Sequence, residues 1–262
     1  MDKIQDILHF WFEGLNDTVQ IDKNAPVVKK WFIKNTQFDQ DIKNKFEKTL
    51  IEAKQGQHRD WEQNASGRLA LVILFDQFSR NIYRASPGAF ETDSRALQLT
   101  LKSIDNKKDQ EFELIERLFL YMPLMHAEDL NIQKTSVEKF TQLTQESKTK
   151  SPPNTSYYMS TLDYAQRHCQ IIERFSRFPH RNEVLSREST KEELIFLAQP
   201  GSRFWFSPKD FNNRWQNRND NDGEDDEGEI FFHKGKIPEE VAEENKRNNP
   251  QNPADHVINQ KF

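Results

Sequence analysis

Apolar residues recur every three or four positions along most of the first 200 residues of the chain. This spacing places them on one face of an α-helix, whereas a half-buried strand would alternate. The first such segment carries Ile4, Ile7, Leu8 and Trp11 and ends near Gly14. The same periodicity, bounded by capping or helix-breaking residues, predicts further helices at about 36–55, 67–85, 87–104, 111–121, 123–140, 157–175 and 193–198.

Residues that start or stop helices lie at several of these ends. Thr36 has the position of an N-cap, and Gly56 has the C′ position of the same helix. Ser189 and Glu192 form a capping-box pattern before the last predicted helix. Pro123 lies inside a periodic region, so it must either kink one helix or begin a new one.

A short apolar run is the one place where a strand competes with a helix. Residues 69–75 have the composition of a buried strand, but their apolar stripe continues through Phe78 and Ile82, which favours a helix. The chain is therefore predicted to be all-α, with about eight to ten helices. The short connections favour antiparallel helical hairpins stacked side by side.

Charge divides the chain into two parts. Residues 1–207 hold 29 Lys and Arg against 29 Asp and Glu, whereas residues 208–262 hold 8 against 13. We therefore expect an all-helical domain at 1–207 and an acidic, Asn-rich tail at 208–262. The tail is expected to be disordered, because its few apolar groups cannot offset the entropy cost of ordering. A short docking segment around residues 230–232 is the alternative within the tail.

Composition also excludes several functions. A neutral helical domain lacks the basic surface that general nucleic-acid binding requires, so no nucleic-acid partner is expected. The single cysteine, Cys169, rules out an internal disulfide and fits a reducing compartment. There is no secretory signal pattern, and the longest apolar run, seven residues, is far shorter than the roughly 20 that span a bilayer. We expect a soluble, cytoplasmic protein without a membrane partner.

One face of the predicted helix at 67–85 is strongly polar. At 100° per residue it collects five side chains: Asp76, Gln77, Arg80, Asn81 and Arg84. Taken alone, this face is typical of a solvated one, because amphipathic helices expose one polar side. An Asp76–Arg80 ion pair on it, four residues apart, would add about 0.2–0.5 kcal/mol.

The predicted helix at 123–140 differs, because hydrogen-bonding side chains interrupt its apolar stripe. His126, Asp129 and Gln133 project on the same side as its apolar residues. A buried polar group without a partner would cost about 1–3 kcal/mol, so each is expected to have one. His168 repeats the pattern on the helix at 157–175. These residues predict an internal polar network.

An arginine-rich segment, RFSRFPHRN, follows at 174–182. Its Phe178-Pro179 step breaks the helix and places the next three residues in a loop: His180, Arg181 and Asn182. The arginines suit two roles, between which the sequence does not choose. They form internal ion pairs with carboxylates of the two helices above, or they bind an anionic ligand through their planar guanidinium groups.

Three segments carry a resemblance to a known family: LALVILFDQFSRNIYR, LYMPLMHAEDLNIQ, and AQRHCQIIERFSRFPHRN followed by LSREST. In this order, over about residues 7–197, the chain resembles the domain-of-unknown-function 924 family. The resemblance implies an all-helical, tetratricopeptide-repeat-like fold in a right-handed array, with no established activity. Ala127 stands where serine is usual in the family, and Ser176 and Ser186 stand where glycine is usual. We therefore place no nucleophile at residue 127.

The residues of these motifs are the candidate site residues. The best catalytic candidates are His126, Asp129 and His180. The candidate binding residues are Asp76, Gln77, Arg80, Asn81, Arg84, Glu128, Gln133, His168, Arg177, Arg181 and Asn182. We expect the three motifs to converge in space. No metal or cofactor is expected, because the histidine spacing matches no zinc motif and no glycine-rich phosphate loop occurs.

Three functions agree with this cluster. A helical-repeat binding module would present a polar pocket to a protein segment or an anionic small molecule, with the arginines supplying the charge. An enzyme would use His126 and Asp129 as an acid/base pair, with the arginines stabilising an anionic substrate. In the third, the polar residues only lock helix packing. The binding module is our preferred prediction. An open pocket reached by His126 and an arginine would separate the first two from the third.

Overall fold

The computed structural model describes residues 2–22, 24–199 and 202, and over these residues the chain is all-α. The α-helices are α1 (Lys3–Phe12), α2 (Pro26–Phe32), α3 (Thr36–Lys54), α4 (Ala65–Val72), α5 (Ser79–Ile82), α6 (Asp93–Asp105), α7 (Leu114–His126), α8 (Leu130–Lys150), α9 (Thr155–Phe175) and α10 (Lys191–Leu197). The shorter helical turns are η1 (Arg59–Gln63), η2 (Ile73–Phe78), η3 (Pro87–Ala89), η4 (Lys108–Glu111), η5 (Pro152–Asn154) and η6 (Pro179–Arg181). Since α4 continues through η2 into α5, the described residues form nine helices and no strand, which confirms the predicted class.

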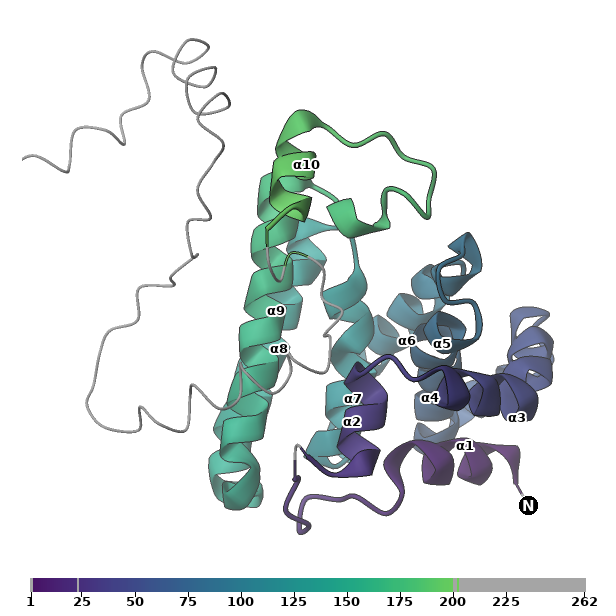
Figure 1. The fold of residues 1–262 in the computed structure, drawn as a ribbon. Coiled ribbons are helices and arrows are strands. Elements are labelled where there is room, and N and C mark those ends of the chain that lie inside the picture. Colours follow the sequence, from purple (N-terminus) through teal and green to yellow (C-terminus); the bar gives the residue numbers. More distant parts are fainter. Residues whose placement is uncertain (1, 23, 200–201, 203–262) are drawn as a thin grey trace, which may run out of the picture. The chain divides into compact units, whose positions relative to one another are not determined.

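The helices pack as neighbours along the chain. In Figure 1, α8 and α9 lie antiparallel, and α8 also packs against α7. α4 contacts α1, α6 and α7, and α3 covers the η2–α5 segment. The α8–α9 pair agrees with the predicted hairpins, whereas the right-handed tetratricopeptide-like array stays a prediction.

Aromatic side chains from α1, α2 and α7 join in the core. Trp11 is fully buried, and its ring meets Phe119 edge-to-face at a centroid distance of 5.4 Å. Trp31 packs on Phe119 in the same manner at 4.7 Å and donates its Nε1–H to the Trp11 carbonyl at 3.0 Å. Edge-to-face pairs add to the free energy gained by burial, so this contact fixes the N-terminal helices against α7.

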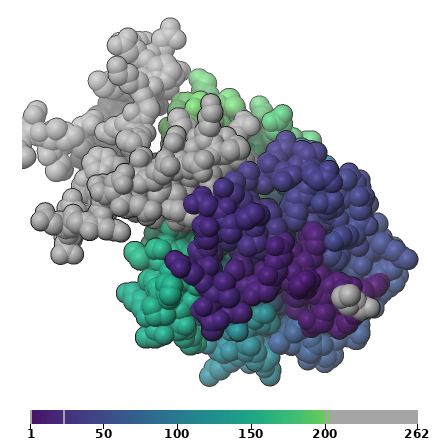
Figure 2. Space-filling view, turned by 60° about the horizontal axis from the view of Figure 1, so that its bottom comes forward, coloured from purple at the N-terminus to yellow at the C-terminus, as the bar shows by residue number. Residues whose placement is uncertain are grey.

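The segment after α1 is held against the α8–α9 turn. The Ile21 amide donates to Asn154 Oδ1 at 2.7 Å, and Asn154 Nδ2 donates to the Val19 carbonyl at 2.9 Å. In the space-filling view of Figure 2, the purple N-terminal residues lie between the blue and the green parts of the chain. One buried asparagine therefore links two segments that are more than 130 residues apart.

Three predicted helix starts need correction by one or two residues. Asn35, not Thr36, caps α3, because its side chain accepts from the Phe38 amide. Asn64 caps α4 in the same way, so this helix begins at Ala65 and not at the predicted residue 67. The capping box of α10 is formed by Thr190 and Glu193 rather than Ser189 and Glu192. In contrast, Gly56 lies just after α3 with φ +82°, as expected for a C′ glycine.

Pro123 neither ends a helix nor begins one. It lies inside α7, which continues to His126, and a new helix starts only at Leu130. The predicted helix at 123–140 is therefore wrong, and His126 and Gln133 do not share one helical stripe. The reason is that the break falls where Asp129 caps α8, three residues beyond the end of α7.

The predicted boundary at residue 207 and the acidic tail at 208–262, with its docking segment at 230–232, lie outside the described residues and stay predictions. None of the helices in the described ranges is both long enough and apolar enough to cross a bilayer.

Candidate functional site

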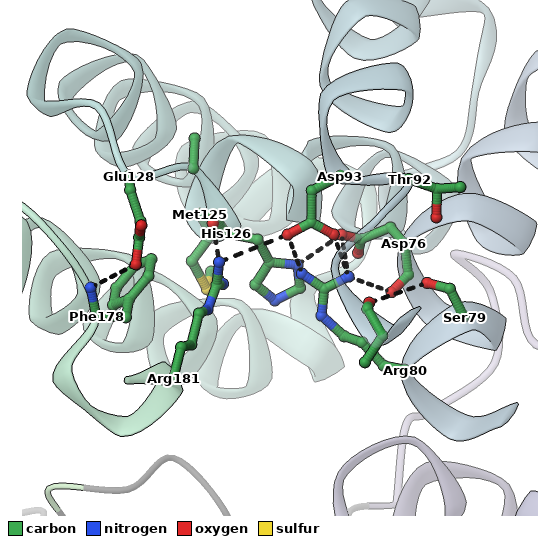
Figure 3. A network of polar contacts seen from close by, with 12 residues as sticks. Asp76, Ser79, Arg80, Thr92, Asp93, Met125, His126, Glu128, Phe178 and Arg181 are labelled. Atoms are coloured by element: carbon green, nitrogen blue, oxygen red, sulfur yellow. Dashed lines mark hydrogen bonds and ion pairs between the residues drawn. The ribbon is translucent and has the colours of Figure 1, made fainter. Parts of the chain in front are cut away.

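Residues from all three motifs meet at one place, which confirms the predicted convergence. Asp76 comes from η2, His126 from the last turn of α7, and Arg181 from η6. His126 Nδ1 lies 2.7 Å from Asp76 Oδ1, and Arg181 Nη2 donates to the His126 carbonyl at 3.0 Å. Figure 3 shows the histidine ring between the two arginines Arg80 and Arg181, with Asp93 bridging them.

Asp76 is the fully buried centre of this network. Its Oδ1 also accepts an ion pair from Arg80 Nη1 at 3.0 Å, and Gln77 Nε2 donates to its Oδ2 at 2.6 Å. Burial alone would raise the pKa of Asp76, but its contacts with Arg80, His126 and Gln77 outweigh this effect and lower the pKa to about 2. The carboxylate is therefore ionised. The Asp76–Arg80 ion pair was predicted correctly. The prediction that this face of the helix is solvated was wrong, because Asp76 and Gln77 are buried.

A π-helical turn presents Asp76 to the site. Its wider backbone ring departs from the α-helical hydrogen-bond pattern, so carbonyls there are available to side chains. The Phe75 carbonyl accepts from Ser79 Oγ and Thr92 Oγ1, both at 2.6 Å, and the Asp76 carbonyl accepts from Arg80 Nη1 at 2.6 Å. Regular 100° periodicity cannot predict this turn, and neither Ser79 nor Thr92 was among the candidates.

His126 combines an oriented ring with a free ring nitrogen. Its Nδ1 is bound to the ionised Asp76, so Nδ1 carries the proton and Nε2 the lone pair. Among the described residues, Nε2 has no hydrogen-bond partner. Burial lowers the pKa of His126; Asp76 opposes this effect, and Arg80 and Arg181 add to it. The neutral imidazole is therefore the form present at neutral pH.

Arg181 lies beside this histidine between two aromatic rings. Its guanidinium carbon is 4.7 Å from the centroid of Phe90 and 4.6 Å from that of Phe178, within cation–π range. The side chain is 7% exposed, and Nε has no hydrogen-bond partner in the described part of the chain. Burial and the nearby Arg80 lower the pKa of Arg181 to about 10, so it stays charged at neutral pH.

Asp93 neutralises both arginines. Arg80 binds it with both terminal nitrogens at 2.9 Å, and Arg181 Nη1 lies 3.5 Å from its Oδ2. With Asp76 and Asp93 negative, Arg80 and Arg181 positive and His126 neutral, the formal charges of the cluster balance. Asp93 lies between the first and the second of the three motif segments, and no sequence signal marked it as a site residue.

A pocket of about 580 Å³ opens onto the cluster. Its lining residues come from the η3–α6 region, the α7–α8 connection and the segment after η6: Pro87, Gly88, Phe90, Glu91, Asp93, Ser94, Leu97, Pro123, His126, Ala127, Glu128, Asp129, Arg181 and Leu185. His126 has 17% of its side chain exposed and reaches this pocket together with Arg181. The cluster is therefore open on the side of this pocket.

The other two histidines lie beside the cluster and do not line this pocket. The rings of His126 and His168 are 6.3 Å apart, and His168 Nδ1 is 2.8 Å from the Tyr164 carbonyl. Burial, with His126 as the next cause, holds the pKa of His168 well below its usual value. Burial and Arg181 lower the pKa of His180 to about 3. His180 is thus near the site but is held neutral away from the pocket.

The predicted His126–Asp129 pair is wrong. Asp129 is the N-cap of α8, where its Oδ1 accepts from the Asn131 and Ile132 amides at 2.8 and 3.0 Å. The partner of His126 is Asp76, 50 residues away. Gln133 has a different role, because its Nε2 donates to the carbonyls at the end of α7, including Met125 and Ala127 at 2.7 Å each.

Most of the other candidates form ion pairs outside the pocket. Asn81 and Arg84 bind Asp39 on α3, with the Arg84 contacts at 2.6 and 2.7 Å. Arg177 binds Glu193 through two nitrogens at 2.7 Å. Internal ion pairing was one of the two roles left open for Arg177, but its partner Glu193 was not identified. Asn81 and Arg84 were expected on a solvated face or in the binding site, not at Asp39.

Two further pairs hold the loop after α9. Asn182 Nδ2 donates to Ser189 Oγ and to Glu193 at 3.0 and 3.2 Å. Glu128 accepts two bonds from Arg187, at 2.7 and 3.0 Å, and one from the Phe178 amide. Within the described ranges, no three His, Cys, Asp or Glu side chains are grouped closely enough to hold a metal ion.

The chain is similar to proteins of unknown function in both sequence and fold. The family model described as "Bacterial protein of unknown function (DUF924)" matches residues 7–201. The fold also matches a solved structure of a protein of unknown function from Agrobacterium tumefaciens, with a TM-score of 0.61 and 31% identity. That match covers 75% of this chain and 97% of the other. No curated protein matches the chain.

Proposed function

The chain belongs to the DUF924 family of bacterial proteins of unknown function, and we propose that it is an enzyme in which His126 acts as a general base on a small molecule bound beside Arg181. The observation that carries the proposal is the 2.7 Å contact of His126 Nδ1 with Asp76. It leaves Nε2 of this pocket-lining residue without a partner among the described residues. This replaces the acid/base pair predicted with Asp129.

The chemistry follows from the different environments of the two ring nitrogens of His126. The Asp76 carboxylate fixes the tautomer and stabilises the imidazolium that forms when Nε2 accepts a proton. A positioned general base contributes about 10²–10⁴ in rate. The lowered pKa of His126 keeps the base unprotonated at neutral pH. The proton comes from a bound water or from an X–H bond of the substrate.

Arg181, which also lines the pocket, supports the proposal. Negative charge that develops on the substrate is best stabilised by fixed donors in a site with little water. Arg181 is charged, nearly buried and held between two rings, so it needs little reorganisation to bind an anion or a polarised carbonyl. The predicted role of the arginines, which is to bind an anionic or acceptor group of the ligand, is kept. It is assigned to Arg181 alone rather than to four arginines.

The pocket size favours a small molecule over a protein segment. A volume of about 580 Å³ is in the range of about 300–1,000 Å³ typical of small-molecule sites. Non-catalytic binding of such a molecule is the alternative at the same place. The outer pairs Arg84–Asp39 and Arg177–Glu193 support only the structural role of these arginines.

The test is to incubate the protein with a small-molecule extract from bacterial cells and to follow consumption by mass spectrometry. We expect one or more compounds to disappear with the wild type and to persist with His126→Gln, which keeps a polar side chain beside Asp76. Ser94→Ala belongs in the same experiment, because Ser94 also lines the pocket and loss of turnover there would indicate a serine nucleophile. Ligand retention without any consumption would overturn the catalytic proposal in favour of binding.

A further inference from the structure

The pocket wall carries far more negative than positive charge. Four carboxylates line it, namely Glu91, Asp93, Glu128 and Asp129, against one cation, Arg181. They come from two separate parts of the chain, the start of α6 and the α7–α8 connection. A ligand that bound only through an anionic group would have to approach past this wall.

Two of the four carboxylates are already neutralised. Asp93 lies against Arg80 and Arg181, and Glu128 accepts two bonds from Arg187. These ion pairs belong to the internal network and are not available to a ligand.

The remaining two carboxylates are at the rim. Asp129 is exposed, and only its Oδ1 is used, as the N-cap of α8. In the described part of the chain no cation pairs with it. Glu91 contacts Lys54 at 2.6 Å, but its side chain is 59% exposed, and exposed pairs of this kind are worth little. The rim thus offers two acidic side chains to a cationic group.

The buried part of the pocket lining, at Arg181, favours an anionic or acceptor group rather than a cationic one. Arg181 is more than nine-tenths buried and lines the pocket. Its guanidinium group has donors and no acceptor, so this position favours a carbonyl or carboxylate oxygen on the ligand. Apolar side chains also line the pocket, including Pro87, Leu97 and Leu185.

We infer that the substrate of this site is a small amine-bearing acyl compound, whose ammonium group lies against Asp129 and Glu91 and whose carbonyl or carboxylate faces Arg181. The apolar walls would hold the hydrocarbon part of the compound. The inference rests on the proposed function for the identity of the site, but it concerns recognition and is tested by binding rather than by turnover.

Three matched probes isolate the ammonium group. Leucine amide carries an ammonium, a carbonyl and an apolar side chain; N-acetyl-leucine amide lacks the charge; 4-methylpentanoate has only the anionic end. We expect titration calorimetry with the full-length protein to show leucine amide binding at least about tenfold more tightly than either analogue, which corresponds to about 1.4 kcal/mol. Tighter binding of 4-methylpentanoate would overturn the inference, as would equal binding of the acetylated probe or no binding of leucine amide at millimolar concentration.

Two variants locate the effect. Asp129→Asn removes the charge but keeps a good N-cap, so α8 stays capped. Combined with Glu91→Gln it should weaken leucine amide binding about tenfold or more. Asp105→Asn, an exposed charge at the far end of α6, is the control and should leave binding unchanged. Equal weakening in the control would contradict the inference. His126→Gln reports on turnover separately, so a failure of catalysis and a failure of recognition are distinguishable.

Discussion

His126 and Asp76 form a 2.7 Å contact between the last turn of α7 and a π-helical turn. The contact joins a fully buried carboxylate to a histidine that reaches the pocket. Because Arg80 binds the same carboxylate oxygen at 3.0 Å, Asp76 is held ionised at any pH above its pKa of about 2. Orientation of the base and stability of the fold therefore depend on one side chain.

Asp76→Asn should reduce both the stability of the fold and the turnover that depends on the orientation of His126. The variant removes the buried negative charge that Arg80 and His126 contact. Breaking a buried ion pair typically costs about 3–5 kcal/mol. We expect a loss near 3 kcal/mol in the free energy of unfolding, measured in urea, because Arg80 keeps Asp93 as a partner. Turnover should fall by about 10²–10⁴ under conditions where the variant is folded, since the tautomer of His126 is no longer fixed.

Asp39→Asn is the matched control for that variant. Asp39 binds Arg84 at the α3–α5 contact and does not line the pocket. Its replacement should lower stability but leave turnover of the folded protein near that of the wild type. If both variants lost turnover equally, the Asp76–His126 contact would have no special catalytic role.

Stability should fall steadily on acidification from pH 6.5 to about 3. Burial lowers the folded-state pKa values of His126, His168 and His180, the last to about 3, so the unfolded chain binds more protons than the folded one in this window. Each such histidine adds up to about 1.4 kcal/mol per pH unit. Asp76 adds a further loss only as the pH falls toward its depressed pKa of about 2.

Urea unfolding at pH 7, 6, 5 and 4 checks this dependence. His180→Asn should reduce the slope, because one buried titrating group is removed. A free energy of unfolding that stays level from pH 7 to pH 4 would show that the three rings accept protons in the folded state without cost.

The helices were predictable where periodicity and caps agree. α1, α3 and α9 lie within about two residues of their predicted ends, because their apolar faces have a regular spacing. Pro123 misled the prediction, since a buried proline can stay inside a helix that its neighbours hold in place. The π-helical turn has no periodic signature at all, and it decides that Asp76 faces inward.

The site was predictable as a set of residues but not as a set of pairs. Polar residues on buried faces indicated a network, and His126 belongs to it, whereas His168 lies beside it. Arg181, which was predicted in a loop, joins the network through the His126 carbonyl. Pairing depends on which elements meet, and the sequence carries no local signal for contacts between separate elements, whether they are 13 or 50 positions apart. Asp39, Asp93 and Glu193 were missed for this reason, because each resembles an ordinary helix-start carboxylate.

Glu193→Gln should loosen the segment after α9 without affecting the chemistry. Glu193 is buried and accepts from Arg177, Asn182 and the Thr190 amide, and the Arg177 bond is the largest cause of its pKa near 2. The amide replaces one acceptor by a donor, so we expect a loss of about 1–3 kcal/mol. Hydrogen exchange should become faster in residues 176–199, and protection that is unchanged there would argue against this role.

Gln133→Leu should separate positioning of His126 from stability in general. Gln133 is fully buried, and its Nε2 donates to the Met125 and Ala127 carbonyls on either side of His126. Leucine has a similar volume but no donor, so the end of α7 loses its anchor at a cost of about 2 kcal/mol. We expect turnover to fall as well, because the backbone that carries the base is no longer held.

Thr144→Val on the same helix provides the comparison for Gln133→Leu. Its buried hydroxyl lies within hydrogen-bond distance of the Phe140 and Tyr158 carbonyls, about three turns from Gln133, so its loss is similar in kind but remote from the pocket. Both variants should melt at lower temperature, yet only Gln133→Leu should lose turnover while still folded. If the two lost stability and turnover in the same proportion, activity would simply follow the folded fraction, and Gln133 would be a structural residue like Thr144. A selective loss would instead mean that α7 ends where it does in order to fix the histidine.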